Sequence, residues 1–229
     1  MNEIVRNITG FRRAAGMPRS LADLLEELGD IPAERVRLQP PPGTATLADL
    51  EAVNERKQGI CELVDGTLVE KAMGQLESSL ALIIAGQLDR YVEAHDSGML
   101  LGADGVLRIL PGIGRAGDVT FIAWSSLPGG RPPPGEDRVP AVVPDLVVEV
   151  LSESNTPREM ARKREEYFRA GVKQVWEIAP KTRSALVYTA ADRSTHIPPN
   201  GTLDGADILP GFLLSLQYVF GRAERMGGR

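Results

Sequence analysis

Apolar residues recur along parts of the chain with the 3.6-residue period of an amphipathic α-helix. The longest such run extends from Leu76 to Ala94, and Gly98 lies just beyond it. Another helix carries two start signals, because Thr156 and Glu159 have the spacing of a capping box and Pro157 takes the first helical position. The pattern predicts helices over residues 46–56, 76–94, 156–171 and 215–220.

Short runs rich in β-branched residues between Gly and Pro signals are typical of strands. Two of these runs flank Asp65 and Gly66, a pair that two-residue hairpins favour because Gly takes positive φ without steric cost. The run from Leu146 to Leu151 is nearly all apolar, which predicts a central strand. The predicted strands are residues 60–64, 67–70, 105–110, 118–124, 146–151, 175–178 and 185–189.

Prolines and glycines indicate where the chain divides. Gln39 to Thr44 contains three consecutive prolines, which stop any regular element. Residues 1–46, with a short amphipathic stretch at 20–28, are therefore predicted to form an N-terminal arm, and residues 47–229 the main domain. The loop from Leu127 to Gly135 is too rich in Pro and Gly for regular structure, and we expect it to be disordered.

Composition narrows the class of protein. The 229 residues, 42% hydrophobic and 25% charged, suit one large globular domain with or without an arm. A single cysteine, Cys61, excludes a disulfide framework and a thiolate metal cluster, and it favours a reducing compartment. The first residues lack the apolar core of a signal peptide, and the longest apolar stretch is far shorter than the about 20 residues of a membrane span. We therefore expect a cytosolic protein.

The net charge of −5 comes from 31 acidic and 26 basic residues. This balance argues against a general nucleic-acid coat protein, whose affinity depends on bulk positive charge. It does not exclude a nuclease, because metal-dependent phosphodiesterases need clustered carboxylates, and a local basic patch is enough to guide the substrate.

Glu149 interrupts the apolar run from Leu146 to Leu151, and a buried carboxylate is costly unless it is paired or bound to a cation. Asp118 opens the preceding strand, and neighbouring strand ends can bring the two carboxylates to one hard cation such as Mg²⁺. The alternative is structural: Asp118 ends a turn, and Glu149 forms an ion pair with a helix. The pattern alone leaves both interpretations open.

The helix after Glu149 supplies a cation. Lys163 and Arg164 flank its apolar stripe on opposite sides, so either can point inward, and the alternative is a solvated basic face. Glu77, near the start of the long helix, is a candidate third acidic ligand, although the first turn of any helix favours Glu. Asp145 is interpreted as a strand-start residue, because four residues along a strand span about 13 Å, too far to share an ion with Glu149.

Other sites are disfavoured. His95 and His196 lie far apart without a Cys or His companion, so we do not expect zinc. Ser152 and Ser154 have no nearby histidine base, which makes a hydrolase triad improbable. The glycines around Ile113 lack the rest of a dinucleotide-binding fingerprint and are interpreted as a turn.

Several motifs in order resemble the putative restriction endonuclease domain family, a branch of the PD-(D/E)XK nuclease superfamily. The resemblance covers the chain from about residue 36 to the end. The motifs are CELVDGTLVE (61–70), GDVTF (117–121), PDLVVEVLS (144–152), KREEYFRAGV (163–172) and VW (175–176).

This resemblance implies a restriction-endonuclease-like α/β fold, in which helices flank a mixed central sheet and the active site lies at one sheet edge. Asp118 matches the family's metal-binding aspartate, Glu149 its glutamate and Glu77 the acidic residue of the first core helix. Lys163 matches a lysine that has moved from the strand to the following helix, and Leu151 stands where the superfamily usually has it. Gly117 replaces the proline before the aspartate, which removes no ligand.

The sequence therefore predicts an endonuclease-like enzyme that hydrolyses phosphodiester bonds, with DNA as the expected substrate. Asp118, Glu149 and the backbone carbonyl of Val150 would hold Mg²⁺ or Mn²⁺, Lys163 would stabilise the attacking water or the transition-state charge, and Glu77 would assist. The first alternative is a catalytically silent nuclease fold that binds nucleic acid or protein. A glycosidase is disfavoured by the 5% content of aromatic residues. A homodimer is expected, since cutting both strands of a duplex often pairs two identical sites.

Overall fold

The structure is a computed structural model that describes residues 20–56, 59–132 and 138–226. Its α-helices are α1 (Leu21–Glu27), α2 (Leu47–Glu55), α3 (Gln75–His95), α4 (Pro157–Ala170) and α5 (Leu216–Arg225). Its strands are β1 (Cys61–Val64), β2 (Thr67–Glu70), β3 (Gly98–Gly102), β4 (Leu107–Leu110), β5 (Ile113–Arg115), β6 (Val119–Ala123), β7 (Leu146–Val150), β8 (Gln174–Ala179), β9 (Ser184–Ala190), β10 (Arg193–Ile197), β11 (Thr202–Asp204) and β12 (Leu213–Ser215).

The larger sheet has six strands in the order β10-β9-β8-β7-β6-β3. β7 and β8 are parallel, whereas β10 and β9, β9 and β8, β7 and β6, and β6 and β3 pair antiparallel. This is the mixed central sheet that the family resemblance implies. β7 lies inside it with a neighbour on each side, which confirms the central position expected from its apolar residues.

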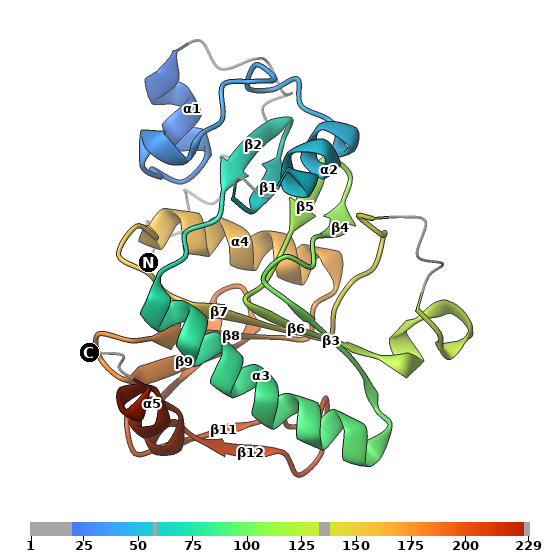
Figure 1. The fold of residues 1–229 in the computed structure, drawn as a ribbon, viewed down its shortest axis with the longest axis vertical. Helices are drawn as coiled ribbons and strands as arrows, with labels where there is room; N and C mark the ends of the chain where they lie inside the picture. The colour runs from blue at the N-terminus through green and yellow to red at the C-terminus, as the bar shows by residue number, and fades with distance from the viewer. Residues whose placement is uncertain (1–19, 57–58, 133–137, 227–229) are drawn as a thin grey trace, which may run out of the picture.

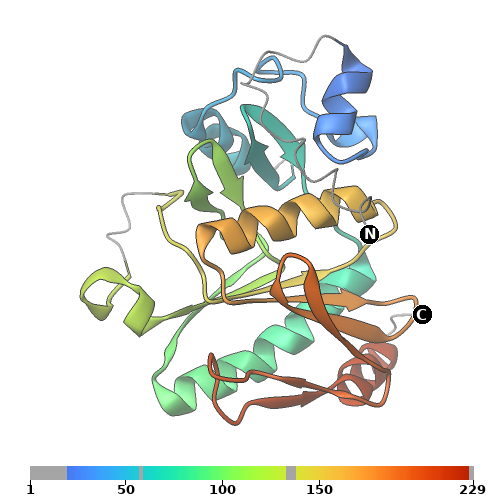
Figure 2. The ribbon, with the colours of Figure 1, turned by 180° about the vertical axis from the view of Figure 1, so that it is seen from behind.

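The elements stack in layers (Figure 1; Figure 2 shows them from behind). α3 and α5 cover one face of the six-stranded sheet, and α4 crosses the other face. A smaller sheet, of order β2-β1-β5-β4, lies beyond α4, so that α4 runs between the two sheets. A side chain on α4 can therefore reach a strand of either sheet.

The two faces of β7 belong to different cores. Val148 and Val150 pack in the core that contains α3 and α5, whereas Val147 packs with Tyr167 of α4. Because successive side chains of a strand point to opposite faces, Glu149 shares the α4 face with Val147. In β1, Cys61 and Leu63 pack beside α2. Glu62 therefore lies on the opposite face of the strand, toward α4.

The start and end of α4 agree with most of the capping signals that the sequence contains. Thr156 accepts a hydrogen bond from the Glu159 N–H at 3.0 Å, Pro157 takes the first position, and Gly171 ends the helix with φ of 110°. The second hydrogen bond of a capping box, from the Thr156 N–H to the Glu159 carboxylate, does not form, so this part of the prediction is wrong. The carboxylate instead accepts two hydrogen bonds from the Arg35 guanidinium, at 2.7 and 2.9 Å. A buried charged partner outcompetes one backbone N–H for that carboxylate.

Residues 20–46 pack against the start of α4. Thr156 donates a hydrogen bond to the carbonyl of Gly29, and Arg158 forms an ion pair with Asp30 at 2.8 Å. Gly29 has φ of +92°, and a Cβ there would come within 2.6 Å of the Glu159 backbone. These contacts hold the described part of the arm on α4, and the division of the chain at residue 46 stays a prediction.

Five strands were not predicted from the sequence, namely β3, β5, β10, β11 and β12. Gly98 lies just beyond the end of α3, as predicted, and it also opens β3, whereas the residue that caps α3 is Asp96 in a left-handed conformation. Gly114, interpreted as part of a turn, lies in β5. β10 was missed because its residues are polar and mostly exposed at the sheet edge, so it shows no apolar alternation.

The loop expected to lack regular structure contains a 3₁₀ turn at Pro128–Gly130, and residues 133–137 lie outside the described residues. In the part of the chain that the structure describes, no helix is both long enough and apolar enough to cross a membrane.

Candidate active site

Asp118 and Glu149 come from neighbouring strands of the six-stranded sheet. Asp118 immediately precedes β6, and its N–H donates to the carbonyl of Val148 at 2.8 Å. Its Oδ2 accepts a hydrogen bond from the N–H of Val150 at 2.6 Å, so the Asp118 carboxylate lies against the residue that follows Glu149. Both side chains are buried, at the carboxyl end of β7.

Lys163 and Tyr167, one turn apart on α4, both contact Glu149. The Nζ of Lys163 lies 3.1 Å from Glu149 Oε1, and the Tyr167 hydroxyl donates to the same oxygen at 2.7 Å. Helical spacing left open whether Lys163 or Arg164 points inward. The structure decides it: Lys163 is 2% exposed among the carboxylates, whereas Arg164 forms an ion pair with Glu177 at 2.6 Å.

Glu62 of β1 is a member of the cluster that the sequence analysis missed. Its side chain is fully buried, and its Oε1 lies 3.2 Å from the Nζ of Lys163. Its Oε2 lies 2.7 Å from the Arg115 guanidinium, and its Oε1 also accepts from the N–H of Ala116. The signal was present, because Glu62 interrupts an apolar strand just as Glu149 does.

Lys71 is the second missed residue. It follows β2, and its Nζ lies 2.9 Å from Asp118 Oδ1 and donates to the carbonyl of Ala116 at 2.7 Å. Its side chain is 4% exposed. No pattern in the sequence marks this lysine, because it simply follows an ordinary hairpin strand. The packing of the two sheets brings it to Asp118.

A second layer of charges surrounds this group. Arg115 joins Glu62 to Glu166 of α4, where the ion-pair distance is 2.6 Å. Arg162 binds Glu166 at 2.8 Å and Asp65, in the β1–β2 turn, at 2.6 Å. The small sheet is therefore tied to α4 by paired charges on both sides of Glu62.

Burial and neighbouring charges shift the pKa values of the cluster in opposite directions. Burial raises the pKa of Glu149, against the attraction of Lys163 and Lys71. Burial also acts to raise the pKa of Glu62, but Lys163 and Arg115 outweigh it and lower that pKa to about 2. For Lys163, burial acts to lower the pKa, yet Glu149 and Glu62 raise it above its ordinary value. Lys163 is therefore a cation at neutral pH.

Glu77 is not in contact with this cluster. It lies in the first turn of α3, where its carboxylate folds over Gly74. Within residues 20–56, 59–132 and 138–226, no hydrogen bond or ion pair joins it to Asp118 or Glu149. The structure thus brings together Asp118, Glu149 and Lys163, and it adds Glu62 and Lys71.

The oxygen donors suit a hard cation, although each carboxylate already has a lysine beside it. Over the described residues, no three His, Cys, Asp or Glu side chains are grouped so as to hold a metal ion. The donors expected from the sequence are two carboxylates and the carbonyl of Val150, whose N–H faces Asp118. Oε1 of Glu149 accepts two hydrogen bonds, whereas its Oε2 accepts none from described residues. This free oxygen and the all-oxygen donor set fit Mg²⁺ or Mn²⁺.

Comparison with known families identifies the chain. Residues 46–217 match the model of the Uma2 family, whose description is putative restriction endonuclease. The chain belongs to this family. The match begins at the N-cap of α2 and ends in α5, so it includes every residue of the Uma2 site described above. Comparison with curated proteins finds no match.

A solved structure supports the Uma2 fold. The crystal structure of a putative nuclease belonging to DUF820 from Anabaena variabilis ATCC 29413 is similar with a TM-score of 0.64 and 17% sequence identity. The similarity covers 72% of this chain and 92% of that chain. The family match makes the chain a member of the Uma2 putative restriction endonuclease family, and the similar structure shows that it has the fold of that putative nuclease.

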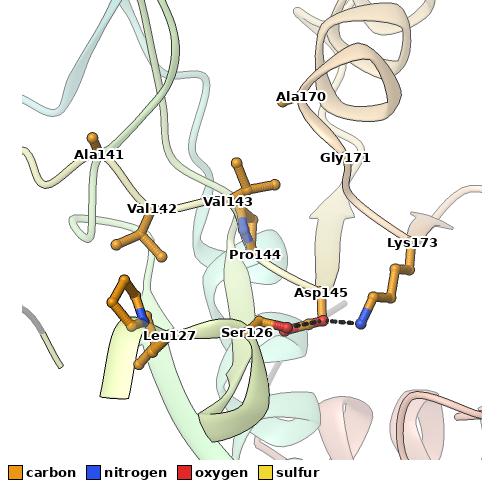
Figure 3. A pocket seen from close by; sticks show the side chains of 11 residues that line it. Ser126, Leu127, Ala141, Val142, Val143, Pro144, Asp145, Ala170, Gly171 and Lys173 are labelled. Carbon is orange, nitrogen blue, oxygen red and sulfur yellow. Dashed lines mark hydrogen bonds and ion pairs between the residues drawn. The ribbon is translucent and has the colours of Figure 1, made fainter. Parts of the chain in front are cut away.

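Asp145 of the Uma2 domain lies at the other end of β7 from Glu149. Its carboxylate accepts hydrogen bonds from the Ala123 N–H at 2.7 Å and the Ser126 hydroxyl at 2.8 Å, and it lies 2.6 Å from the Nζ of Lys173. Figure 3 shows Asp145 between Ser126 and Lys173, and these three residues help to line a hollow of about 440 Å³. Asp145 thus ties the start of β7 to the segments beside it, as expected of a strand-start residue.

Proposed function

We propose that this Uma2 protein is a metal-dependent nuclease that hydrolyses phosphodiester bonds in DNA. The observation that carries the proposal is the contact of the α4 lysine Lys163 with Glu149, beside the Asp118 carboxylate that the neighbouring strand places against the N–H of Val150. Family membership and fold support the nuclease class. Two carboxylates beside a buried ammonium form the arrangement that phosphodiester hydrolysis needs, namely cation ligands and a positive charge near the developing negative charge.

The donors Asp118, Glu149 and the Val150 carbonyl would hold Mg²⁺ or Mn²⁺. The bound ion would supply a Lewis acid for the phosphate and a water of lowered pKa. Tyr167 fixes Oε1 of Glu149, so that Oε2 is the oxygen left for a ligand. Glu77 would assist from the first turn of α3, which begins four residues after Lys71, itself a contact of Asp118.

Lys163 would stabilise the charge on the phosphate oxygens or orient the attacking water. Its raised pKa keeps the ammonium charged, and Glu149 and Glu62 hold it at 3.1 and 3.2 Å. Because α4 is pinned at its start by Arg35 and in its middle by Arg115, the lysine is held by a rigid element. A homodimer would place two such sites on the two strands of a duplex.

One observation favours a second candidate, a catalytically silent fold that binds nucleic acid or protein. Asp118 and Glu149 each already pair with a lysine, and all four side chains are buried. Charges that neutralise one another in this way also stabilise a fold that has lost its chemistry.

Cleavage of supercoiled plasmid with and without Mg²⁺ tests the proposal. The wild type should nick the plasmid only with the cation, and Glu149→Gln should lose at least about a hundred-fold in rate, since it removes a ligand charge. Glu153→Gln is the matched control, because this exposed glutamate follows the same strand and pairs with the exposed Lys181. Equal cleavage by Glu149→Gln and wild type refutes the site, and no cleavage by any preparation favours the silent fold.

A further inference from the structure

Lys71 places a positive charge where a cation ligand is expected. Its ammonium contacts Asp118 Oδ1 at 2.9 Å and the carbonyl of Ala116 at 2.7 Å, two hard oxygen atoms. The other Asp118 oxygen is engaged by the N–H of Val150. Both Asp118 oxygens therefore have a partner while Lys71 stays in this position.

The charge balance of the buried cluster depends on this lysine. Lys71, Lys163 and Arg115 face Asp118, Glu149 and Glu62, and the further carboxylate that Arg115 contacts, Glu166, is also paired with Arg162. A further cation beside Asp118 would leave an excess of positive charge in a buried place, which is unfavourable. Departure of one of the lysines would remove that excess.

Lys71 is held by fewer carboxylates than Lys163. Its backbone is held by the N–H donating to the Ile60 carbonyl at 2.7 Å, and within the described part of the chain its ammonium forms one ion pair, with Asp118. Lys163, by contrast, lies on α4 between the two carboxylates Glu149 and Glu62. The segment between β2 and α3 has no regular structure, and Met73 within it is exposed, so a long side chain can swing outward there without disturbing a strand.

We propose that Lys71 is a built-in competitor of the metal ion: its ammonium holds Asp118 in the metal-free protein and moves out to solvent when a divalent cation is bound. This inference rests on the proposed function, because it assumes that Asp118 is a metal ligand. Lys71 then sets how tightly the site takes its cation, and it keeps the Asp118 carboxylate neutralised when none is present.

The affinity for Mn²⁺, measured by calorimetry on the full chain without DNA, tests the competition. Lys71→Met removes the ammonium and keeps an unbranched side chain of slightly shorter length, so its Kd should fall at least about ten-fold, because a charge about 3 Å from a ligand is lost. Lys173→Met is the matched control, since it removes a lysine from Asp145 at the far end of β7, and its Kd should equal that of the wild type. Equal affinity of Lys71→Met and wild type overturns the competition alone. No Mn²⁺ binding by either protein overturns the metal site and, with it, this inference.

A second measurement uses the wild type and separates movement of Lys71 from a general effect of charge. Reductive methylation followed by mass spectrometry reports how accessible each lysine amine is. Saturation with Mn²⁺ should speed the labelling of Lys71 several-fold, while Lys173, which is already 58% exposed, serves as the internal reference. Unchanged labelling of Lys71 in Mn²⁺-saturated protein means that the ammonium has not moved and overturns the proposal, whatever the variant does.

Discussion

Replacing Glu62 by Gln probes the ion cluster that holds Lys163. The side chain is fully buried between the Lys163 ammonium at 3.2 Å and the Arg115 guanidinium at 2.7 Å. Gln has nearly the same shape but no charge, so the variant leaves two buried cations with one counter-ion fewer. We expect it to lose stability without a change of fold.

The size of the loss follows from the pKa of Glu62. The neighbouring cations outweigh burial and lower that pKa from 4.5 to about 2 in the folded protein. At about 1.4 kcal/mol per pKa unit, the ionised form contributes about 3 kcal/mol to the free energy of unfolding at pH 7. Breaking one side of a buried ion pair independently suggests about 3 to 5 kcal/mol.

The stability contribution of the Glu62 charge depends on pH. Because the folded-state pKa lies below the unfolded one, this stability is present above pH 4.5 and is lost as the pH falls toward 2. The gap between wild type and Glu62→Gln should therefore be about 3 kcal/mol at pH 7 and shrink to about 1.5 kcal/mol near pH 3. Urea unfolding followed by circular dichroism measures it, with Glu153→Gln, an exposed glutamate, as the control.

Two outcomes would refute this reasoning. A loss below about 1 kcal/mol at pH 7 would mean that Glu62 does not carry the charge balance of the cluster. A gap that stays constant from pH 7 to pH 3 would mean that the loss comes from packing, because only an ionising group has a stability contribution that depends on pH.

Three further predictions follow from the same contacts. Mn²⁺ should raise the Tm of the wild type by mass action, and Asp118→Asn should abolish most of the rise. Lys163→Ala should slow DNA cleavage by several powers of ten while metal binding persists. Arg164→Ala leaves the buried Glu177 carboxylate without its ion-pair partner, so it should mainly lower the Tm and slow cleavage far less. Gly29→Ala should cost at least about 2 kcal/mol in urea unfolding, because φ is +92° and a Cβ would meet the Glu159 backbone.

Each of these has a contrary result. An equal Tm rise in Asp118→Asn removes Asp118 from the metal site. Single-turnover cleavage by Lys163→Ala at the wild-type rate makes the assignment of the helix lysine wrong. Wild-type stability of Gly29→Ala would show that the arm is not held on α4 by this close approach.

The local elements near the site were predictable from residues close together in the chain. Thr156, Pro157 and Gly171 mark α4 because a cap and a left-handed end involve neighbouring backbone groups. Glu149 stood out because a charge in an apolar strand needs a partner. These signals involve residues that are close together in the sequence, and for this reason the sequence alone determines these elements.

The composition of the site was decided by tertiary structure. The choice between Lys163 and Arg164 depended on the rotation of α4 between two sheets, and sequence spacing does not set that rotation. Glu62 reaches Lys163, and Lys71 reaches Asp118, only because the small sheet packs over α4. Such pairs lie far apart in the chain, so no local pattern encodes them. The physical reason is that a buried charge requires an opposite charge nearby, but the sequence does not say which strand will bring it.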